Sequence, residues 1–326
     1  MTRTDADTET GEVVTRSPDV TVIAPRDVPL GGPRAMTVRR TLPSRERTTI
    51  GAWCFLDHYG PDPVSATGGM SVPPHPHTGL QTVSWLFEGE IEHRDSTGVQ
   101  ALVRPGELNL MTAGSGIQHS EVSTPSTTVL HGVQLWVVLP ERAANQSPHF
   151  DARSSKKARL GDATVRLFLG SLAGVGLITA PTYTRLLAAQ VDLPAGGVVT
   201  LDVNPGCEHG ILVDHGSVSL CDTVIPSHHL GVLDTGHSSL TLTAGDGPAR
   251  VLLLGGEPFT EDIVMWWNFI GRSHDDIERA RAQWQDGLER GSARFGHLDH
   301  MPALPAPTLP TVRLKARGNP RPGQPQ

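Results

Sequence analysis

Four residues in the first half of the chain have the types and spacing of a metal-binding set. His75 and His77 lie two positions apart, each directly after a proline, and His119 and Glu121 repeat that spacing about 40 positions later. Residues i and i+2 of an extended segment point to the same side. If the two segments occupy neighbouring strands of one small barrel, the four side chains meet inside it. Three neutral imidazoles and a carboxylate suit a divalent first-row metal ion such as iron, manganese, nickel, copper, cobalt or zinc.

Each pair has a simpler explanation when taken alone. A single His-x-His or His-x-Glu pair is more often a surface or hydrogen-bonded pair than a metal site. The two pairs occur together beside Gly and Pro in a half of the chain rich in strand patterns, and this favours a metal. Four protein ligands leave octahedral positions open for substrate, whereas a closed tetrahedral site would be structural.

Composition limits the class of protein. The chain has 326 residues, a formal net charge of −7, and 35 Gly and 27 Pro residues, about a fifth of the total. That excess of turn-forming residues favours short strands over long helices. The net negative charge argues against non-specific DNA binding. No apolar run of 18 residues and no secretory signal are found, and the three cysteines form no framework or Cys-x-x-Cys site, so we expect a cytoplasmic protein.

Strand patterns dominate until about residue 257. The clearest pair is 81–87 and 91–94, joined by a turn at Glu88-Gly89-Glu90. Further strands are expected at 134–139, 164–169, 184–193, 210–214, 218–220 and 250–254. One helix is expected after Ser273, which can form a capping box with Asp276. Its apolar stripe should pack on the second β unit, and this stripe is formed by Ile277, Ala280, Trp284 and Leu288.

The remaining histidines and aromatic residues give weaker signals. His58 and His131 are expected to be packing or hydrogen-bonding residues, with a role behind the metal ligands as the alternative. His93 follows a predicted turn and is expected at the surface, and His228-His229 falls in a loop. Trp85 and Met111 are candidates for the lining of the pocket.

Five segments carry a resemblance to a known family. They are FLDHYGP (55–61), PPHPHTGLQTVSWLFEGEIEHRDSTG (73–98), RPGELNLMTAGSGIQHSE (104–121), LHGVQLWVVLP (130–140) and GGEPFTEDIVMW (255–266). The spacing of the two motifs resembles the cupin pattern, and the chain is similar to the pirin family of bicupins across about residues 20–290. The resemblance implies an all-β protein with two jelly-roll-like cupin barrels face to face. It also implies one metal ion, usually iron(II), held in the first barrel by His75, His77, His119 and Glu121.

The composition of the segments and the resemblance together predict a domain plan. We expect a disordered tail at 1–18, a cupin domain with the metal site at 19–140 and a linker at 141–162. A second cupin domain with the helix but without a metal site should follow at 163–292, and a Pro-rich tail at 293–326. Gln81 stands where most cupins carry a carboxylate ligand. We therefore expect it to lower the negative charge of the site and to favour an anionic or enolate-like substrate.

Two functions follow from the resemblance. Some bacterial pirins open flavonols such as quercetin with O₂, as 2,3-dioxygenases, and here Glu121 would take the proton of the substrate hydroxyl. The alternative is an iron-sensing regulator that binds a transcription factor or a metabolic enzyme without turnover. A basic patch would favour that alternative, but Arg39, Arg40, Arg45 and Arg47 are expected to form a solvated face. A small-molecule substrate, no direct contact with nucleic acid or membrane, and a monomer are expected.

Overall fold

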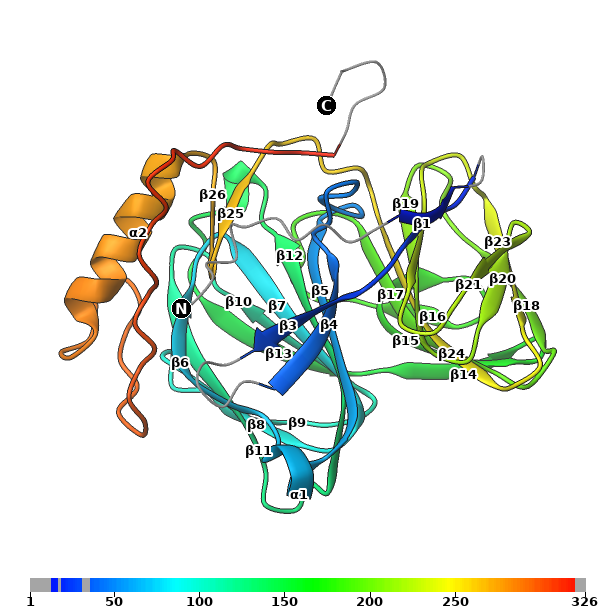
Figure 1. Cartoon of the computed structure of the whole chain (residues 1–326), viewed down its shortest axis with the longest axis horizontal. Helices are drawn as coiled ribbons and strands as arrows, with labels where there is room; N and C mark the ends of the chain where they lie inside the picture. Colours follow the sequence, from blue (N-terminus) through cyan, green and yellow to red (C-terminus); the bar gives the residue numbers. More distant parts are fainter. Residues whose placement is uncertain (1–12, 17–18, 31–35, 320–326) are drawn as a thin grey trace.

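The structure, a computed structural model, describes residues 13–16, 19–30 and 36–319. These residues form two β units side by side, with one longer helix at the edge of the first unit (Figure 1). The predicted all-β class with a short C-terminal helix is confirmed.

The first unit contains two sheets that enclose the candidate metal centre. Its strands are β3 Arg26–Leu30, β4 Met36–Leu42, β5 Trp53–Pro63, β6 Ser71–His77, β7 Leu80–Glu88, β8 Ile91–Asp95, β9 Gln100–Val103, β10 Glu107–Thr112, β11 Ile117–Ser123, β12 Val129–Val138 and β13 His149–Ser154. One sheet has the order β13-β10-β7-β12-β5-β4-β3 and the other has the order β6-β11-β8-β9. A short helix, α1 (Val64–Thr67), and a 3₁₀ turn, η1 (Glu141–Ala143), interrupt the strands. The sheets meet where Ser84 of β7 donates a hydrogen bond to Glu121 of β11.

The second unit combines two N-terminal strands of the chain with the strands that follow the first unit. Its strands are β1 Val13–Arg16, β2 Thr21–Ile23, β14 Lys156–Leu160, β15 Ala163–Leu172, β16 Gly176–Ile178, β17 Leu186–Leu193, β18 Val198–Asp202, β19 Glu208–His215, β20 Val218–Leu220, β21 Thr223–Ile225, β22 Leu230–Leu233, β23 Ser239–Ala244 and β24 Ala249–Gly256. The larger sheet has the order β1-β2-β22-β19-β24-β17-β15-β14, with β16 beside β15. The smaller sheet has the order β18-β23-β20-β21.

Two of the expected domain limits differ from the observed strands. Strands β1 and β2 belong to the sheet of the second unit, although we expected disorder up to residue 18 and the first domain from residue 19. The rest of segment 1–18 lies outside the described residues. Half of the expected linker at 141–162 is strand, because β13 pairs with β10 of the first unit and β14 pairs with β15 of the second.

The expected strand pair 81–87 and 91–94 is wrong as a pairing. Both strands exist, but β7 pairs with β10 and β12, whereas β8 pairs with β9 and β11 in the opposite sheet. Gly89 turns the chain from one sheet to the other with φ +92°, and a side chain there would meet the Val129 carbonyl oxygen at 2.6 Å. Glycine at this corner permits both the left-handed backbone and the close approach.

An apolar interface joins the two units. Trp85 of β7 is fully buried and stacks on Phe168 of β15, with ring centroids 4.2 Å apart. Its indole N–H donates to the Gln190 side chain of β17 at 3.0 Å. A single cluster of buried apolar side chains draws on both units. Trp85 therefore faces the second unit and does not line the candidate metal centre.

The C-terminal segments return to the first unit. Strands β25 (Val264–Trp266) and β26 (Phe269–Gly271) form a hairpin, and helix α2 (His274–Gly287) follows it with the predicted capping box at Ser273. The expected position of this helix on the second unit is wrong. Phe269 bridges to Thr78, directly after β6, and Figure 1 shows α2 on the side of the first unit away from the second. The tail is also anchored, since the Leu304 amide donates to the Pro74 carbonyl.

Candidate metal centre

The two predicted metal-binding motifs lie on adjacent antiparallel strands. The register of β6 and β11 places His75 opposite His119. It then shifts, so that Glu121 lies opposite Val72, because β6 has one more residue than β11 between these pairs. The extra residue lies in Pro73-Pro74, and proline is tolerated here because β6 is an edge strand.

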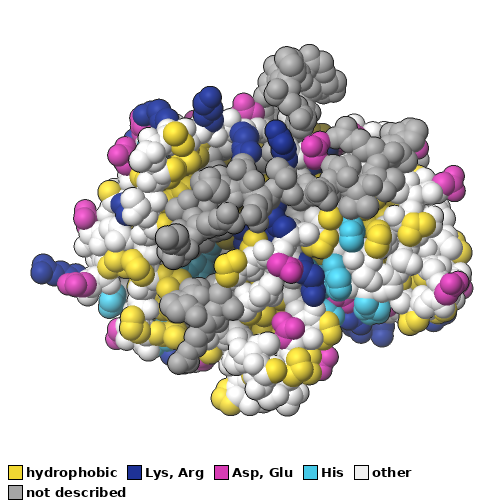
Figure 2. All heavy atoms as spheres, in the orientation of Figure 1, with side chains coloured by type: hydrophobic (Ala, Val, Ile, Leu, Met, Phe, Trp, Pro, Cys, Tyr) yellow, Lys and Arg dark blue, Asp and Glu magenta, His cyan; other side chains and the backbone are white. Residues whose placement is uncertain are grey.

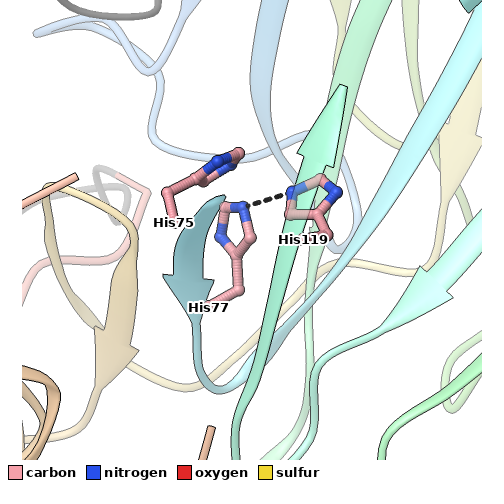
Figure 3. Close-up of side chains that lie close together, drawn as sticks. All are labelled: His75, His77 and His119. Atoms are coloured by element: carbon pink, nitrogen blue, oxygen red, sulfur yellow. Dashed lines mark hydrogen bonds between the residues drawn. The ribbon is translucent and has the colours of Figure 1, made fainter. Parts of the chain in front are cut away.

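Three imidazoles converge between these strands. His75, His77 and His119 present ligand atoms that all lie within 4.8 Å of one another. The Nε2 atoms of His77 and His119 are 3.1 Å apart, as the dashed line in Figure 3 marks. Two nitrogen ligands at right angles on one metal ion, each about 2.1 Å from it, are about 3.0 Å apart. The observed separation fits shared coordination.

Backbone carbonyls set the tautomers of two of these imidazoles. His75 Nδ1 donates to the Pro73 carbonyl at 2.9 Å, and His77 Nδ1 donates to the Asn268 carbonyl at 3.2 Å. A neutral imidazole that donates through Nδ1 has a free lone pair on Nε2. The loop between β25 and β26, some 190 positions from His77, thus prepares that residue for metal binding.

Burial keeps the three imidazoles neutral. His75 is 6 % exposed and His119 is fully buried. Burial lowers the pKa of His75 to about 4, and it lowers the pKa of His77 and of His119 well below the ordinary value. A metal ion therefore meets no proton competition from these groups near pH 7. The donor set fits a divalent first-row metal ion.

Glu121, the fourth predicted ligand, is buried beside these imidazoles but does not join all three. A carboxylate oxygen of Glu121 lies within 4.8 Å of ligand atoms of His93 and His119. His119 is therefore the one residue that this group has in common with the three-imidazole cluster. Ser84 donates to Glu121 Oε1 at 3.2 Å. Burial raises the pKa of Glu121 above the ordinary value, so its carboxylate is a stronger base than an exposed Glu.

Two residues of the site were missed or misplaced by the sequence. His93 was expected at the surface but is 3 % exposed, and it lies opposite Glu121 on β8. Trp136 of β12 packs edge-on against His77, with ring centroids 5.2 Å apart, and it takes the lining role considered for Trp85. The His-x-Asp spacing of His93 and Asp95 in the sequence could have indicated that His93 belongs to the site.

Gln81 does not affect the charge of the cluster in the way we expected. Its amide donates to the Thr112 hydroxyl and to the Pro181 carbonyl of the second unit. Alternation along β7 places Gln81 on the face of Trp85, opposite the face from which Ser84 reaches Glu121. Gln81 therefore contributes to the contact between the units.

A second buried cluster joins the two units. Asp214 of β19 accepts hydrogen bonds at one oxygen from His58 Nε2 (2.7 Å) and His131 Nε2 (2.5 Å), both from the first unit. His215 and Arg250 face its other oxygen. Burial would raise the pKa of Asp214, but the imidazole donors outweigh burial and hold that pKa well below its ordinary value. The expected hydrogen-bonding role of the two histidines is thus extended to a link between the units.

Acid should weaken this link. Burial lowers the pKa of His58 to about 4, whereas an unfolded histidine titrates near pH 6.5. Between pH 6.5 and pH 4, His58 therefore binds a proton in the unfolded chain but not in the folded protein. The free energy of unfolding falls as the pH drops through this range. His58 should account for about 2 kcal/mol of the loss between pH 7.5 and pH 5.

Urea unfolding of wild type and His58→Gln at both pH values measures this contribution. Gln retains a donor for Asp214 but cannot titrate, so its loss on acidification should be about 2 kcal/mol smaller than that of wild type. His149→Gln, at a partly exposed position, is the matched control. An identical pH dependence in wild type and His58→Gln would contradict the prediction.

The four arginines considered for a basic patch do not form one. Arg40 is 6 % exposed and pairs with Asp57, and Arg47 pairs with Glu208 and Asp234. Arg39 is half-buried and donates to the Gly60 carbonyl. Of the four arginines, Arg45 alone is exposed. On the face drawn in Figure 2, Lys and Arg side chains are interspersed with Asp and Glu. The expected solvated face is therefore replaced by partly internal ion pairs.

Comparison with known proteins agrees with this architecture. Residues 35–137 match the family described as Pirin, and residues 188–290 match the one described as Pirin C-terminal cupin domain. A Pseudomonas aeruginosa protein named "Putative quercetin 2,3-dioxygenase" is 42% identical over 88% of this chain and 90% of its own. A pirin-like protein of Caulobacter vibrioides is 34% identical over 83% and 94% of the two chains.

A solved structure supports the same assignment. The crystal structure of a quercetin 2,3-dioxygenase from Acinetobacter baumannii superposes with a TM-score of 0.84 at 34% identity, covering 91% of this chain and 98% of that one. Among the described residues, neither helix has the length and apolar character needed to cross a membrane. The two matched domains and these relatives together show that the chain belongs to the pirin family of bicupins.

Proposed function

We propose that this protein is a metal-dependent dioxygenase that holds one divalent metal ion, iron(II) in the cell, and opens a flavonol-like substrate with O₂. The observation that carries the proposal is the convergence of His75, His77 and His119 on one point in a buried site, with two Nε2 atoms 3.1 Å apart. The names of its relatives, at 42% and 34% identity, support quercetin as the first substrate to test.

The protein's own residues would provide binding, orientation and proton handling. The three imidazoles would hold the metal ion, which supplies a Lewis-acidic and redox-active centre of the kind that dioxygen chemistry uses. The burial of the site excludes bulk water and strengthens electrostatic interactions with a substrate. Trp136, packed on His77, gives an aromatic wall suited to a flat ring system.

Glu121 is the residue proposed to take the proton of the substrate hydroxyl. Its raised pKa makes it a stronger proton acceptor than an ordinary carboxylate, and the Ser84 hydroxyl lies 3.2 Å from one of its oxygens. The Ser84 hydroxyl also lies 2.8 Å from the Gln134 side-chain oxygen, so its single hydrogen is shared between two acceptors and the carboxylate belongs to a polar network inside the barrel.

The test is turnover of quercetin by iron-loaded protein in air. Loss of the flavonol absorbance should be catalysed by wild type and by His149→Ala, a histidine outside the cluster, and it should be absent in His75→Ala. Metal binding by wild type without turnover of quercetin or related flavonols would reject the enzymatic proposal and favour a metal-sensing role.

Replacing Glu121 with Gln should separate proton transfer from metal binding. We expect the turnover number to fall by about 10²-fold or more, because Gln cannot accept the proton. Metal content should persist, because the three imidazoles remain. Glu88→Gln, an exposed residue at the end of β7, is the matched control. Turnover within threefold of wild type would rule out Glu121 as the base.

A further inference from the structure

Two buried residues behind the cluster have no role in the function proposed above. His93 and Asp95 lie on β8, where Asp95 pairs with His119 and His93 pairs with Glu121 across the ladder to β11. His93 is 3 % exposed and Asp95 is 1 % exposed. Burying a carboxylate is costly unless donors satisfy it, so this placement calls for an explanation.

The two side chains form a directed chain of hydrogen bonds that ends at His119. Asp95 uses Oδ1 to accept from the backbone amide and the hydroxyl of Thr97, at 2.8 and 2.6 Å. Its Oδ2 lies 3.1 Å from His93 Nε2. A carboxylate oxygen accepts, so His93 Nε2 carries a hydrogen and, in the neutral ring, His93 Nδ1 has a lone pair.

That lone pair determines the state of His119. The Nδ1 atoms of His93 and His119 are 3.3 Å apart, so one of them must donate and the other must accept. Since His93 Nδ1 is the acceptor, His119 donates through Nδ1 and keeps a lone pair on Nε2. This Nε2 is the atom that faces His77 Nε2 at 3.1 Å.

The orientation of the His93 ring is fixed from its other side. Phe150 of β13 stacks on it, with ring centroids 4.7 Å apart and an interplanar angle of 28°. Hydrogen bonds at both nitrogens and a stacked neighbour leave the His93 ring one favourable orientation. Backbone carbonyls perform the equivalent task for His75 and His77, but His119 depends on side chains alone.

We propose that the Asp95–His93 pair is a positioning unit that holds His119 in the tautomer and orientation in which its Nε2 binds the metal ion. The inference rests on the proposed metal site and adds to it two residues that hold one of its ligands. Outer partners of this kind typically change metal affinity by 10- to 100-fold when they are removed. The negative charge of Asp95, transmitted through two imidazoles, also makes His119 a stronger donor to the metal than an isolated imidazole.

The test is Co²⁺ affinity, measured by equilibrium dialysis together with the visible absorption spectrum of the bound ion. His93→Phe can stack on Phe150 but cannot accept from His119, and it should weaken binding 10- to 100-fold. His93→Asn places a side-chain oxygen near the former Nδ1, and it should restore affinity to within about fivefold of wild type with an unchanged spectrum. His300→Phe is the matched control, because His300 contacts Ser120, the neighbour of His119, and no predicted ligand.

The outcomes are distinguishable. Wild-type affinity in His93→Phe would overturn the inference. Equal weakening of Co²⁺ binding in His93→Phe and His93→Asn, with an altered cobalt spectrum in His93→Asn, would also overturn it, because this result would identify His93 as a metal ligand. Urea unfolding of the metal-free variants distinguishes a loss of metal affinity from a general structural defect. Such a defect would lower the free energy of unfolding in His93→Phe and in His93→Asn alike. Failure of wild type to bind Co²⁺ would instead remove the metal site on which the proposed function depends.

Discussion

Replacing His119 with Ala should lower the affinity of the protein for Co²⁺ or Ni²⁺ by at least about 100-fold. The side chain supplies one of three converging nitrogens, and its loss should exceed the 10- to 100-fold effect typical of outer contacts. Equilibrium dialysis and metal analysis of the purified protein measure the effect. The same substitution should abolish the rise in Tm that metal gives to wild type, because that rise depends on binding to the folded state.

The control for this prediction is His149→Ala. That imidazole is partly exposed, it bonds to the nearby Ser147 carbonyl, and it lies outside the candidate metal-binding groups. Its removal should leave affinity within twofold of wild type. An equally small effect of His119→Ala would show that the metal, if bound, is held elsewhere.

Replacing Trp85 with Ala should lower the free energy of unfolding by about 3–5 kcal/mol. The indole ring is fully buried between the two units, stacks on Phe168 and donates to Gln190. Truncation leaves a cavity in the interface and an acceptor without its donor. Urea unfolding monitored by circular dichroism measures the loss, and weakened coupling of the units should appear as a broader or two-step transition.

Two further substitutions define the origin of the loss. Trp85→Phe keeps an aromatic ring against Phe168 but removes the indole donor, so it should cost less than Trp85→Ala. Val224→Ala, at a position 61% exposed, should change stability by less than about 0.5 kcal/mol. A loss below 1 kcal/mol in Trp85→Ala would contradict the role assigned to this interface.

The strand content and much of the predicted cluster were accessible from local sequence. The alternation of β7 residues, the turn at Gly89 and the capping box of α2 depend on neighbours a few positions away. The spacing of His75 and His77 likewise places both side chains on one side of a strand, whatever that strand pairs with. These features are set by backbone geometry, so a single sequence suffices to predict them.

Local sequence does not determine which distant strands pair with one another. Alternation along β7 shows that Gln81 and Trp85 share a face, but pairing with β10 and β12 decides that this face meets the second unit. The residues around Gly89 predict a hairpin, because a turn by itself does not specify whether the chain returns to the same sheet or crosses to the other. His93 was misplaced for the same reason, since the second sheet places it opposite Glu121.

The sequence alone therefore determined the strand-rich character of the chain and the residue types of the candidate metal centre, because periodicity and turn chemistry act over short distances, whereas the two barrels were an implication of the family resemblance. Only the tertiary structure decided which nitrogens face one another, how Glu121 stands relative to them, and that Asn268, nearly 200 positions away, supports His77. Those relations depend on strand register and on the packing of two sheets, which arise from the chain as a whole.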